Sequence, residues 1–508
     1  MEPRTFGRRH PAVRRVGLTL VWLLCVSLGF VAGYAASRYG LAGEVKRLVR
    51  LVYPAPTPTP LFDPVEAVAP VLEIAMSDDD YARLVQDRDS IIASGQVLRT
   101  QPADVLAASV RLDAGEALSA TVQLKGTQVT HIRDPQKWSL RIDIAGEGAV
   151  QGMAHFTIHH PKERNYLNEW YYLWALEQEG LAALRYEFVR VTLHGEDLGI
   201  YAVEELPEPS MLARSGRLDG PLLRFDQTAL LQEWVAFGDA LKKGAGSGAG
   251  GLAAAQVQPF YPEALLTGDE EARAAYIHGA ALLDAFRRGE VSASQAFDVP
   301  LTARFLALTD LFGSWHGLNW NNLRLYYNPT SLRLEPVGYD TNAGDDISNV
   351  GLAGQGNLAF EFDDSGQLLE RLFADVGLSR AYVAELTRLA DPAWLEGYLA
   401  AQRAQAERNY ALLYPEFPEA DYTTTAFERN AEYIRKVLQP EAPGLQAWFG
   451  AYNGAGGLEG GGTVTLMLGN LQRLPVEPLQ VTFQGVALKP VPTFSAVVLP
   501  AHRAQVEF

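Results

Sequence analysis

Hydrophobic and polar positions alternate with a period of two through much of the first half of the chain. The segments 106–113, 118–126, 137–146 and 152–158 each predict a strand with one face toward a core and one toward water. Two more strands, joined by a His-Gly-Glu-Asp turn, are predicted within 186–205. This part of the chain is therefore expected to form a mainly antiparallel sheet.

The period becomes helical in 164–180, where Leu167, Trp170 and Trp174 recur on one face. A helix of this length among the predicted strands makes residues 65–228 an α+β region.

Two later segments also alternate. Residues 322–340 read as a strand, an Asn-Pro turn and a second strand, which predicts a hairpin. Alternating segments close the chain and predict a small C-terminal β module, for which we take 441–508. The body between linker and module, 65–440, is treated as one domain.

The N-terminus predicts membrane attachment. Residues 16–36 carry no charge and are apolar enough to cross a bilayer core of about 30 Å. Arginines precede this run, so 1–15 are expected to be a cytoplasmic basic tail and the body to lie outside the cytoplasmic membrane. The run exceeds the apolar core of a signal peptide and no Ala-x-Ala site follows, which favours an uncleaved single-pass anchor over a cleaved signal. Residues 37–64 then form a juxtamembrane and Pro-rich linker.

Charge and cysteine content narrow the possible partners. The formal net charge is −17, and the first 50 residues carry nine Lys/Arg against two acids, so the other 458 residues sum to −24. Such an acidic body repels phosphate backbones, which excludes nucleic acid as the expected partner. The single cysteine, Cys25, lies in the predicted anchor, so no disulfide within the chain and no Cys-based zinc site is expected.

Polar residues gather at one end of the predicted hairpin. The sequence contains no H-E-x-x-H, no G-x-S-x-G and no P-loop, and no G-x-G-x-x-G follows a predicted strand. Asn319, Asn321 and Asn322 precede the first strand of the hairpin, and Asp340 and Asn342 follow its second. Because the strands are antiparallel, both groups are expected at the same end. An Asn and an Asp placed in this way hold Mg²⁺ on phosphates in kinases. The same residue types also end strands and turns without any chemistry, so both interpretations stay open.

Seven segments, in order, resemble the spore-coat-protein-H-like (CotH) kinase family, in its membrane-anchored bacterial branch. The resemblance covers roughly 65–440 and rests on VQLKG, KWSLRI, GMAHFTI, HPKERNYLNEW, LRYEFVRVTLHGEDLGIYAVEE, GPLLRFD and HGLNWNNLRLYYNPTSLRLEPVGYD. It implies a rearranged protein-kinase-like fold that binds ATP with Mg²⁺ or Mn²⁺. It also implies that the substrate is a Ser or Thr of a secreted or envelope protein.

The resemblance assigns roles to five residues. Asp340 matches the family's metal-binding Asp, Asn322 matches an Asn that binds metal and cofactor, and Asn342 stands at a second metal-ligand position. Lys137 becomes a candidate phosphate contact and catalytic residue, with a solvated lysine as its plain alternative. Glu205 becomes a catalytic candidate that pairs with a lysine, with a structural role as its alternative.

The chain departs from the family before the Asn pair. Active relatives carry an acid there that acts on the substrate hydroxyl, whereas this chain has Trp315, His316 and Gly317, with Asp310 further back. His316 is therefore the candidate base. Two functions stay open: an atypical protein kinase, or a non-catalytic, pseudokinase-like envelope scaffold or binding protein.

Overall fold

The computed structural model describes most of the chain beyond the N-terminal segment. The described residues are 61–62, 66–94, 104–126, 129–237, 251–261, 270–351, 364–441, 444–453, 462–483, 485–491, 497–500 and 502–508. All of them belong to the unit Leu61–Phe508.

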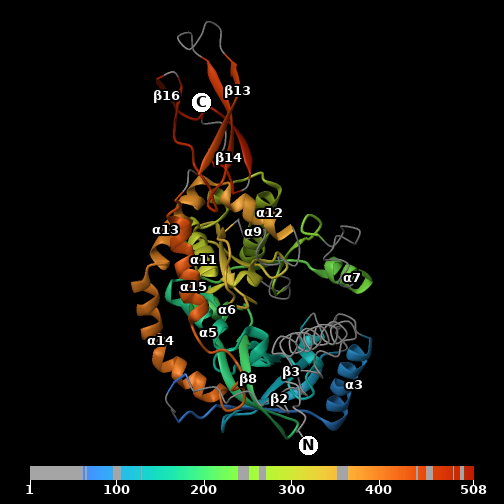
Figure 1. Ribbon diagram of the computed structural model, residues 1–508. Helices are drawn as coiled ribbons and strands as arrows, with labels where there is room; N and C mark the ends of the chain where they lie inside the picture. Colours follow the sequence, from blue (N-terminus) through green and yellow to red (C-terminus); the bar gives the residue numbers. More distant parts are fainter. Residues whose placement is uncertain are drawn as a thin grey trace, which may run out of the picture. The chain divides into compact units, whose positions relative to one another are not determined.

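A closed seven-stranded barrel forms the first part of this unit. Its strands, in the order in which they pair, are β1 (Val71–Ala75), β2 (Leu106–Leu112), β3 (Leu118–Leu124), β4 (Leu140–Ile144), β5 (His155–His159), β8 (Glu196–Glu205) and β7 (Tyr186–Leu193). Neighbouring strands are antiparallel, except that β1 closes the barrel by pairing in parallel with β7. Figure 1 shows several of these strands in blue to teal.

Alternation along the strands supplies two separate cores. Val191 of β7 and Val203 of β8 belong to the cluster that fills the barrel with Ile142 and Phe156. The residues between them on the same strands, such as Ala202, face the helical core instead. Strands β7 and β8 are therefore buried on both faces.

A second, mixed sheet contains the predicted hairpin. Its strands, in pairing order, are β10 (Val257–Pro259), β9 (Leu222–Phe225), β11 (Arg324–Asn328), β12 (Arg333–Gly338) and β6 (Ala182–Ala183). Strands β11 and β12 pair antiparallel with Arg324 opposite Val337, which confirms the hairpin. Strand β6 pairs in parallel with β12.

Most of the helices pack around the second sheet or against one another, whereas α3 packs on the barrel strands β2 and β3. The helices are α3 (Asp78–Ser94), α4 (Thr130–Arg133), α5 (Leu167–Gln178), α6 (Pro209–Arg214), α7 (Thr228–Phe237), α9 (Glu270–Arg288), α10 (Ala293–Ala296), α11 (Val299–Phe312), α12 (Asp364–Phe373), α13 (Val376–Leu389), α14 (Pro392–Leu413) and α15 (Thr425–Leu438), with 3-10 turns η2 (Pro161–Arg164) and η4 (Trp315–Leu318). Helix α11 contacts α5, α13, α15 and β12, so it lies at the centre of the helical core.

The last part of the chain is made of short strands. Three form one sheet in the order β13 (Leu445–Asn453), β14 (Thr463–Asn470) and β17 (Arg503–Glu507), and β15 (Val481–Phe483) pairs with β16 (Val486–Leu488). They enclose a small core of their own that includes Val464, Leu468 and Val506.

The expectation of a rearranged protein-kinase-like fold with a transmembrane helix is wrong for the described structure. The strands that suggested it close into a barrel, because β1 returns to pair with β7. A period of two is the same in an open sheet and in a barrel, so the sequence pattern could not distinguish them. No helix in the described ranges has the length and apolar character of a membrane span, and the predicted anchor at 16–36 lies outside those ranges.

Candidate functional site

The predicted site lies where β12 leaves the second sheet. Asp340 follows β12 by two residues, and His316 comes from the turn η4, which precedes β11. Gly317 allows the turn to pack closely here, since a Cβ at this position would lie 2.9 Å from Thr341 Cγ2 and 3.0 Å from Tyr339 O. The His-Gly sequence therefore brings the imidazole to the end of the strand.

The backbone around Asp340 is held in an uncommon conformation. Asp340 and Asn342 have φ of 51° and 48°, in the left-handed region that is unfavourable for most residues. Glu169, buried in the first turn of α5, fixes this loop by accepting hydrogen bonds from Thr341 N (3.1 Å), Thr341 Oγ1 (2.8 Å) and Ala343 N (3.2 Å). Strained backbone of this kind is concentrated at functional sites.

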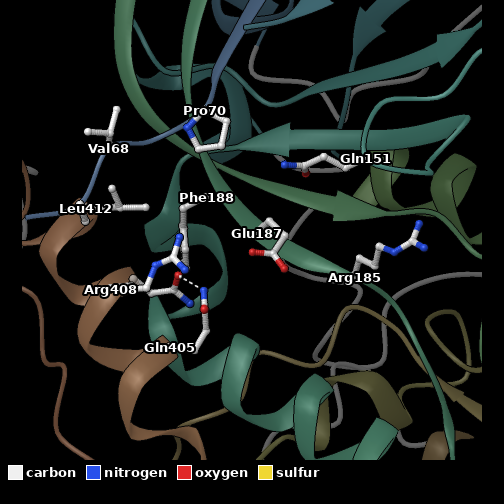
Figure 2. Close-up of a pocket in the computed structure, with 11 residues that line it drawn as sticks. Val68, Pro70, Gln151, Arg185, Glu187, Phe188, Gln405, Arg408 and Leu412 are labelled. Atoms are coloured by element: carbon white, nitrogen blue, oxygen red, sulfur yellow. Dashed lines mark hydrogen bonds between the residues drawn. The ribbon is translucent and has the colours of Figure 1, made fainter. Parts of the chain in front are cut away.

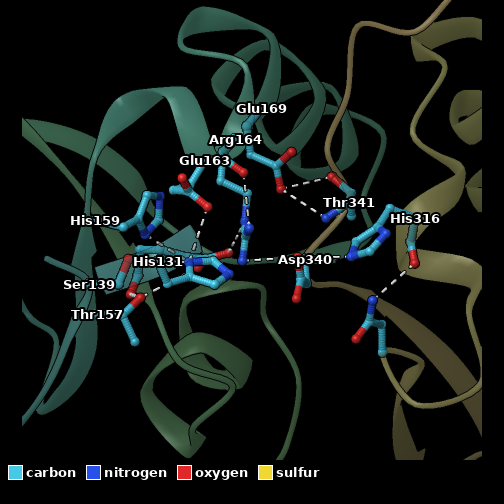
Figure 3. A network of polar contacts seen from close by, with 12 residues as sticks. His131, Ser139, Thr157, His159, Glu163, Arg164, Glu169, His316, Asp340 and Thr341 are labelled. Carbon is cyan, nitrogen blue, oxygen red and sulfur yellow. Dashed lines mark hydrogen bonds and ion pairs between the residues drawn. The ribbon is translucent and has the colours of Figure 1, made fainter. Parts of the chain in front are cut away.

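Two cationic or basic side chains point at Asp340 from different elements (Figure 3). Arg164 Nη2, at the end of η2, lies 2.9 Å from Asp340 Oδ1, and His316 Nε2 lies 3.6 Å from the same atom. Arg164 also approaches Glu204 Oε1, with its Nε 3.6 Å away. Asp340 and His316 keep 21% and 30% of their side chains exposed, so the pair is accessible from solvent.

Glu204 of β8 extends the network along the outer face of the barrel strands. Its Oε2 lies 3.3 Å from Lys125 Nζ and accepts a 3.4 Å hydrogen bond from Thr157 Oγ1. Beside it, His131 Nδ1 lies 3.2 Å from Glu163 Oε2. The cluster thus joins the end of the barrel strands to the hairpin, with Lys125 and Arg164 as its permanent cations.

Electrostatics sets the protonation states in this cluster. Burial raises the pKa of Asp340, but Arg164 together with His316 and Lys125 outweighs that effect and holds the pKa of the carboxyl well below its usual range. Burial lowers the pKa of His131 to about 3, with Lys125 and Arg164 acting in the same direction, so this imidazole is neutral near pH 7. Burial raises the pKa of Glu169 to about 7, against the opposing effect of Arg164.

The donor atoms fit a divalent ion that arrives with its own phosphate ligands. Two buried side-chain amide oxygens have no hydrogen-bond partner, namely Oδ1 of Asn342 and Asn321, and the Asp340 carboxylate, which is paired with Arg164, supplies further oxygens. They are hard oxygen donors, which suit Mg²⁺ or Mn²⁺. Within the described ranges, no group of three or more His, Cys, Asp or Glu side chains could hold a metal alone. In proteins, Mg²⁺ is often held by one or two carboxylates together with the phosphates of a bound nucleotide. One carboxylate with amide oxygens therefore suits an ion that binds with a nucleotide better than an ion held by the protein alone.

Asn322 and Asn342 lie in this neighbourhood. The buried Asn322 donates from Nδ2 to His316 O at 3.2 Å, so both residues belong to one turn. Asn165 Nδ2 lies 3.5 Å from the backbone oxygen of Asn342. The side-chain oxygen of Asn342 has no hydrogen-bond partner.

Lys137 has other partners. Its Nζ lies 2.7 Å from Glu416 Oε1 and donates to the carbonyls of Leu198 and, at 3.0 Å, Ile200. Burial lowers its pKa, while Glu416 acts against that shift. These contacts tie the region after α14 to β8, which is a structural arrangement.

Glu205 is likewise bonded within the fold. It is fully buried and accepts hydrogen bonds from Arg185 N at 2.8 Å and from Arg214 Nη2 at 2.7 Å. Asp310 is also buried, with Gly351 N and the Tyr382 hydroxyl as donors. Both carboxylates are held away from the Asp340 cluster by these partners.

Some members of the network were not predicted, among them Lys125, Arg164, Glu169 and Glu204. The segments that contain them, VQLKG, HPKERNYLNEW and AVEE, were recognised, but their roles were not. At the end of β8, the predicted site residue was Glu205, but its neighbour Glu204 is the one that joins the network. Adjacent residues of a strand face opposite sides, so the two carboxylates have different surroundings. Nothing in the local sequence distinguishes the two faces.

A separate cavity of about 380 Å³ lies between β7, α14 and the segment before β1, as Figure 2 shows. Its walls include Glu187 together with Arg185 and Arg408, so groups of both charges meet there. None of the predicted site residues lines it.

Comparison with known proteins does not identify a family. No protein-family model matches the chain, and no curated protein matches it significantly. The interpretation of the site therefore rests on the residues and geometry described above.

Proposed function

We propose that the chain binds a nucleoside triphosphate with Mg²⁺ or Mn²⁺ at the Asp340 end of the β11–β12 hairpin and transfers a phosphoryl group to a protein hydroxyl. The observation that carries the proposal is the convergence of Asp340, His316 and Arg164, with unbonded amide oxygens beside them. A hard-oxygen donor set next to guanidinium and ammonium groups suits a metal–triphosphate.

Each group has a definite task in this proposal. Asp340 with Asn342 or Asn322 would hold the ion, which supplies neutralisation of phosphate charge when bound. Arg164 and Lys125 would contact phosphate oxygens, because both are fixed cations at the cluster. Lys125 here takes the task that the resemblance had assigned to Lys137.

His316 is the proposed general base. Its imidazole is partly exposed, and the Asp340 carboxylate 3.6 Å away would orient it and stabilise the imidazolium that forms. His316 would accept the proton of a substrate Ser or Thr hydroxyl. The substrate class proposed is an envelope or secreted protein, on the strength of the predicted anchor at 16–36 and an extracytoplasmic body.

A specific observation favours a second function, nucleotide binding without transfer in an envelope scaffold. Asp310, the acid nearest in sequence before the Asn pair, is buried with Tyr382 and Gly351 as partners. It offers no free carboxylate to a substrate hydroxyl. Phosphoryl transfer would then require His316 as the base, and without it the chain would bind a nucleotide and not transfer phosphate.

Titration calorimetry with Mn²⁺–ATP, paired with transfer of labelled phosphate to protein, tests both functions on wild type and His316→Gln. Unchanged binding with transfer lost in the variant supports the kinase. Binding with no transfer by the wild type supports the scaffold. No binding by the wild type refutes both.

A further inference from the structure

Two arginines form a like-charged pair beside the proposed nucleotide site. Strands β9 and β11 pair antiparallel with Leu223 opposite Leu325 and Leu222 opposite Tyr326. The next position of this register places Arg224 opposite Arg324. Directly opposed residues have Cβ atoms about 5 Å apart, and like charges in such positions destabilise a sheet.

Within the described ranges, neither guanidinium has a carboxylate partner. Among the described residues, Arg224 and Arg324 form no ion pair with Asp or Glu, and the Nε of each is buried without a hydrogen bond. Arg324 is only 4% exposed, and its bonds are donations from Nη1 to the carbonyls of Asn321 (2.9 Å) and Leu323 (3.0 Å). Buried charges in proteins are otherwise paired, because an uncompensated one is costly.

Aromatic rings gather the pair into one place. Both guanidinium carbons lie near the Phe260 ring, at 5.4 Å for Arg224 and 5.5 Å for Arg324, and Arg324 also lies 4.3 Å from the centre of the Tyr339 ring. The neighbouring Tyr261 hydroxyl is buried and unbonded. These rings hold the cations in position without neutralising them.

The pair also lies next to Asp340. Arg324 donates to the Asn321 carbonyl and stacks on Tyr339, the residue before Asp340. An anion bound between the two guanidiniums would remove their repulsion.

We propose that Arg224 and Arg324 form an anion subsite that binds a phosphate group of the nucleotide. Arginine suits this task, because its planar fork donates two parallel hydrogen bonds to phosphate oxygens. The nucleotide as the source of the phosphate rests on the proposed function, whereas affinity for phosphate itself does not.

The test is titration calorimetry of the full chain with pyrophosphate in the presence of EDTA, so that no metal takes part. Wild type is expected to bind, with affinity about tenfold to a hundredfold weaker in Arg224→Met, the loss of a charge-assisted contact. Arg224 makes no hydrogen bond to any residue that the structure describes, so this variant is expected to fold. Arg324→Lys keeps the charge but loses the fork and is expected to weaken binding as well. Arg133→Met removes an exposed arginine and is the matched control, with wild-type affinity expected.

The outcomes separate the subsite from the proposed function. Loss of pyrophosphate binding in Arg224→Met, with retention in Arg133→Met, supports the subsite even if Mn²⁺–ATP does not bind. No pyrophosphate binding by the wild type, or equal affinity in Arg224→Met, overturns it whatever the result with Mn²⁺–ATP.

Discussion

Removal of the Arg164 side chain tests whether the ion network holds the site together. Arg164 is 4% exposed as a side chain and faces two carboxylates, Asp340 at 2.9 Å and the fully buried Glu204 at 3.6 Å. Arg164→Met keeps much of the side-chain volume but leaves both carboxylates without this cation. Breaking a buried ion pair by removing one partner costs about 3–5 kcal/mol of unfolding free energy. We expect a loss in that range at pH 7.

The pH dependence of this loss follows from the sign of the Asp340 shift. The folded-state pKa of Asp340 is depressed, so its pairing contributes stability above the unfolded pKa of about 3.9 and loses it as pH falls through the folded value. In Arg164→Met this contribution is missing. The stability difference between the variant and wild type is therefore largest near pH 7 and shrinks below about pH 4.

Urea unfolding of the full chain, followed by tryptophan fluorescence, measures the difference. The matched control is Arg429→Met, because Arg429 pairs with Asp346 at 2.7 Å while their side chains stay 55% and 60% exposed. Exposed pairs contribute about 0–1 kcal/mol. The double variant Arg164→Met/Asp340→Asn should recover part of the loss. An Arg164→Met loss no larger than that of Arg429→Met would refute the reasoning.

Three further variants test individual groups. Burial raises the pKa of Asp310 to about 8. Between about pH 4 and pH 8 the folded chain therefore binds more protons than the unfolded chain, and its stability falls as pH rises. Asp310→Asn should lack this fall, and parallel curves of melting temperature against pH for the two proteins would contradict it. Lys137→Met should cost about 1–3 kcal/mol in urea unfolding, because it removes the partner of a Glu416 side chain that is 33% exposed. The variant should leave Mn²⁺–ATP affinity unchanged in calorimetry, and a selective loss of affinity would restore Lys137 to the site. Asp340→Ala should be about 1 kcal/mol less stable than Asp340→Asn in the same assay, since Asn tolerates the left-handed backbone better than Ala; equal stabilities would show that the φ of 51° carries no strain.

Local signals in the sequence were sufficient for the hairpin. Alternation, the Asn-Pro turn and the polar residues at both strand ends are all contained within about 20 residues, and β11 and β12 pair as expected. The structure also brings Asn322, His316 and Asp340 to the same end.

Long-range closure was not visible in the sequence. The barrel depends on β1 pairing with β7, more than 100 residues later, and no local pattern encodes that contact. The partners of Asp340 are similarly remote, because Arg164 and Glu204 come from segments that the barrel and α5 bring to the hairpin. Glu205 was chosen on the family resemblance, whereas the facing of β8 in the closed barrel brings Glu204 to the network.

The central claim is that Asp340 helps bind a metal–nucleotide. Its most direct test is calorimetric titration of Mn²⁺–ATP into wild type, Asp340→Asn and Asp346→Asn, the last removing an exposed acid of the same loop. The account predicts binding by wild type and Asp346→Asn and loss of at least about tenfold in affinity in Asp340→Asn, whose amide fits the same backbone but lacks the charge. Equal affinity in Asp340→Asn and wild type would contradict it.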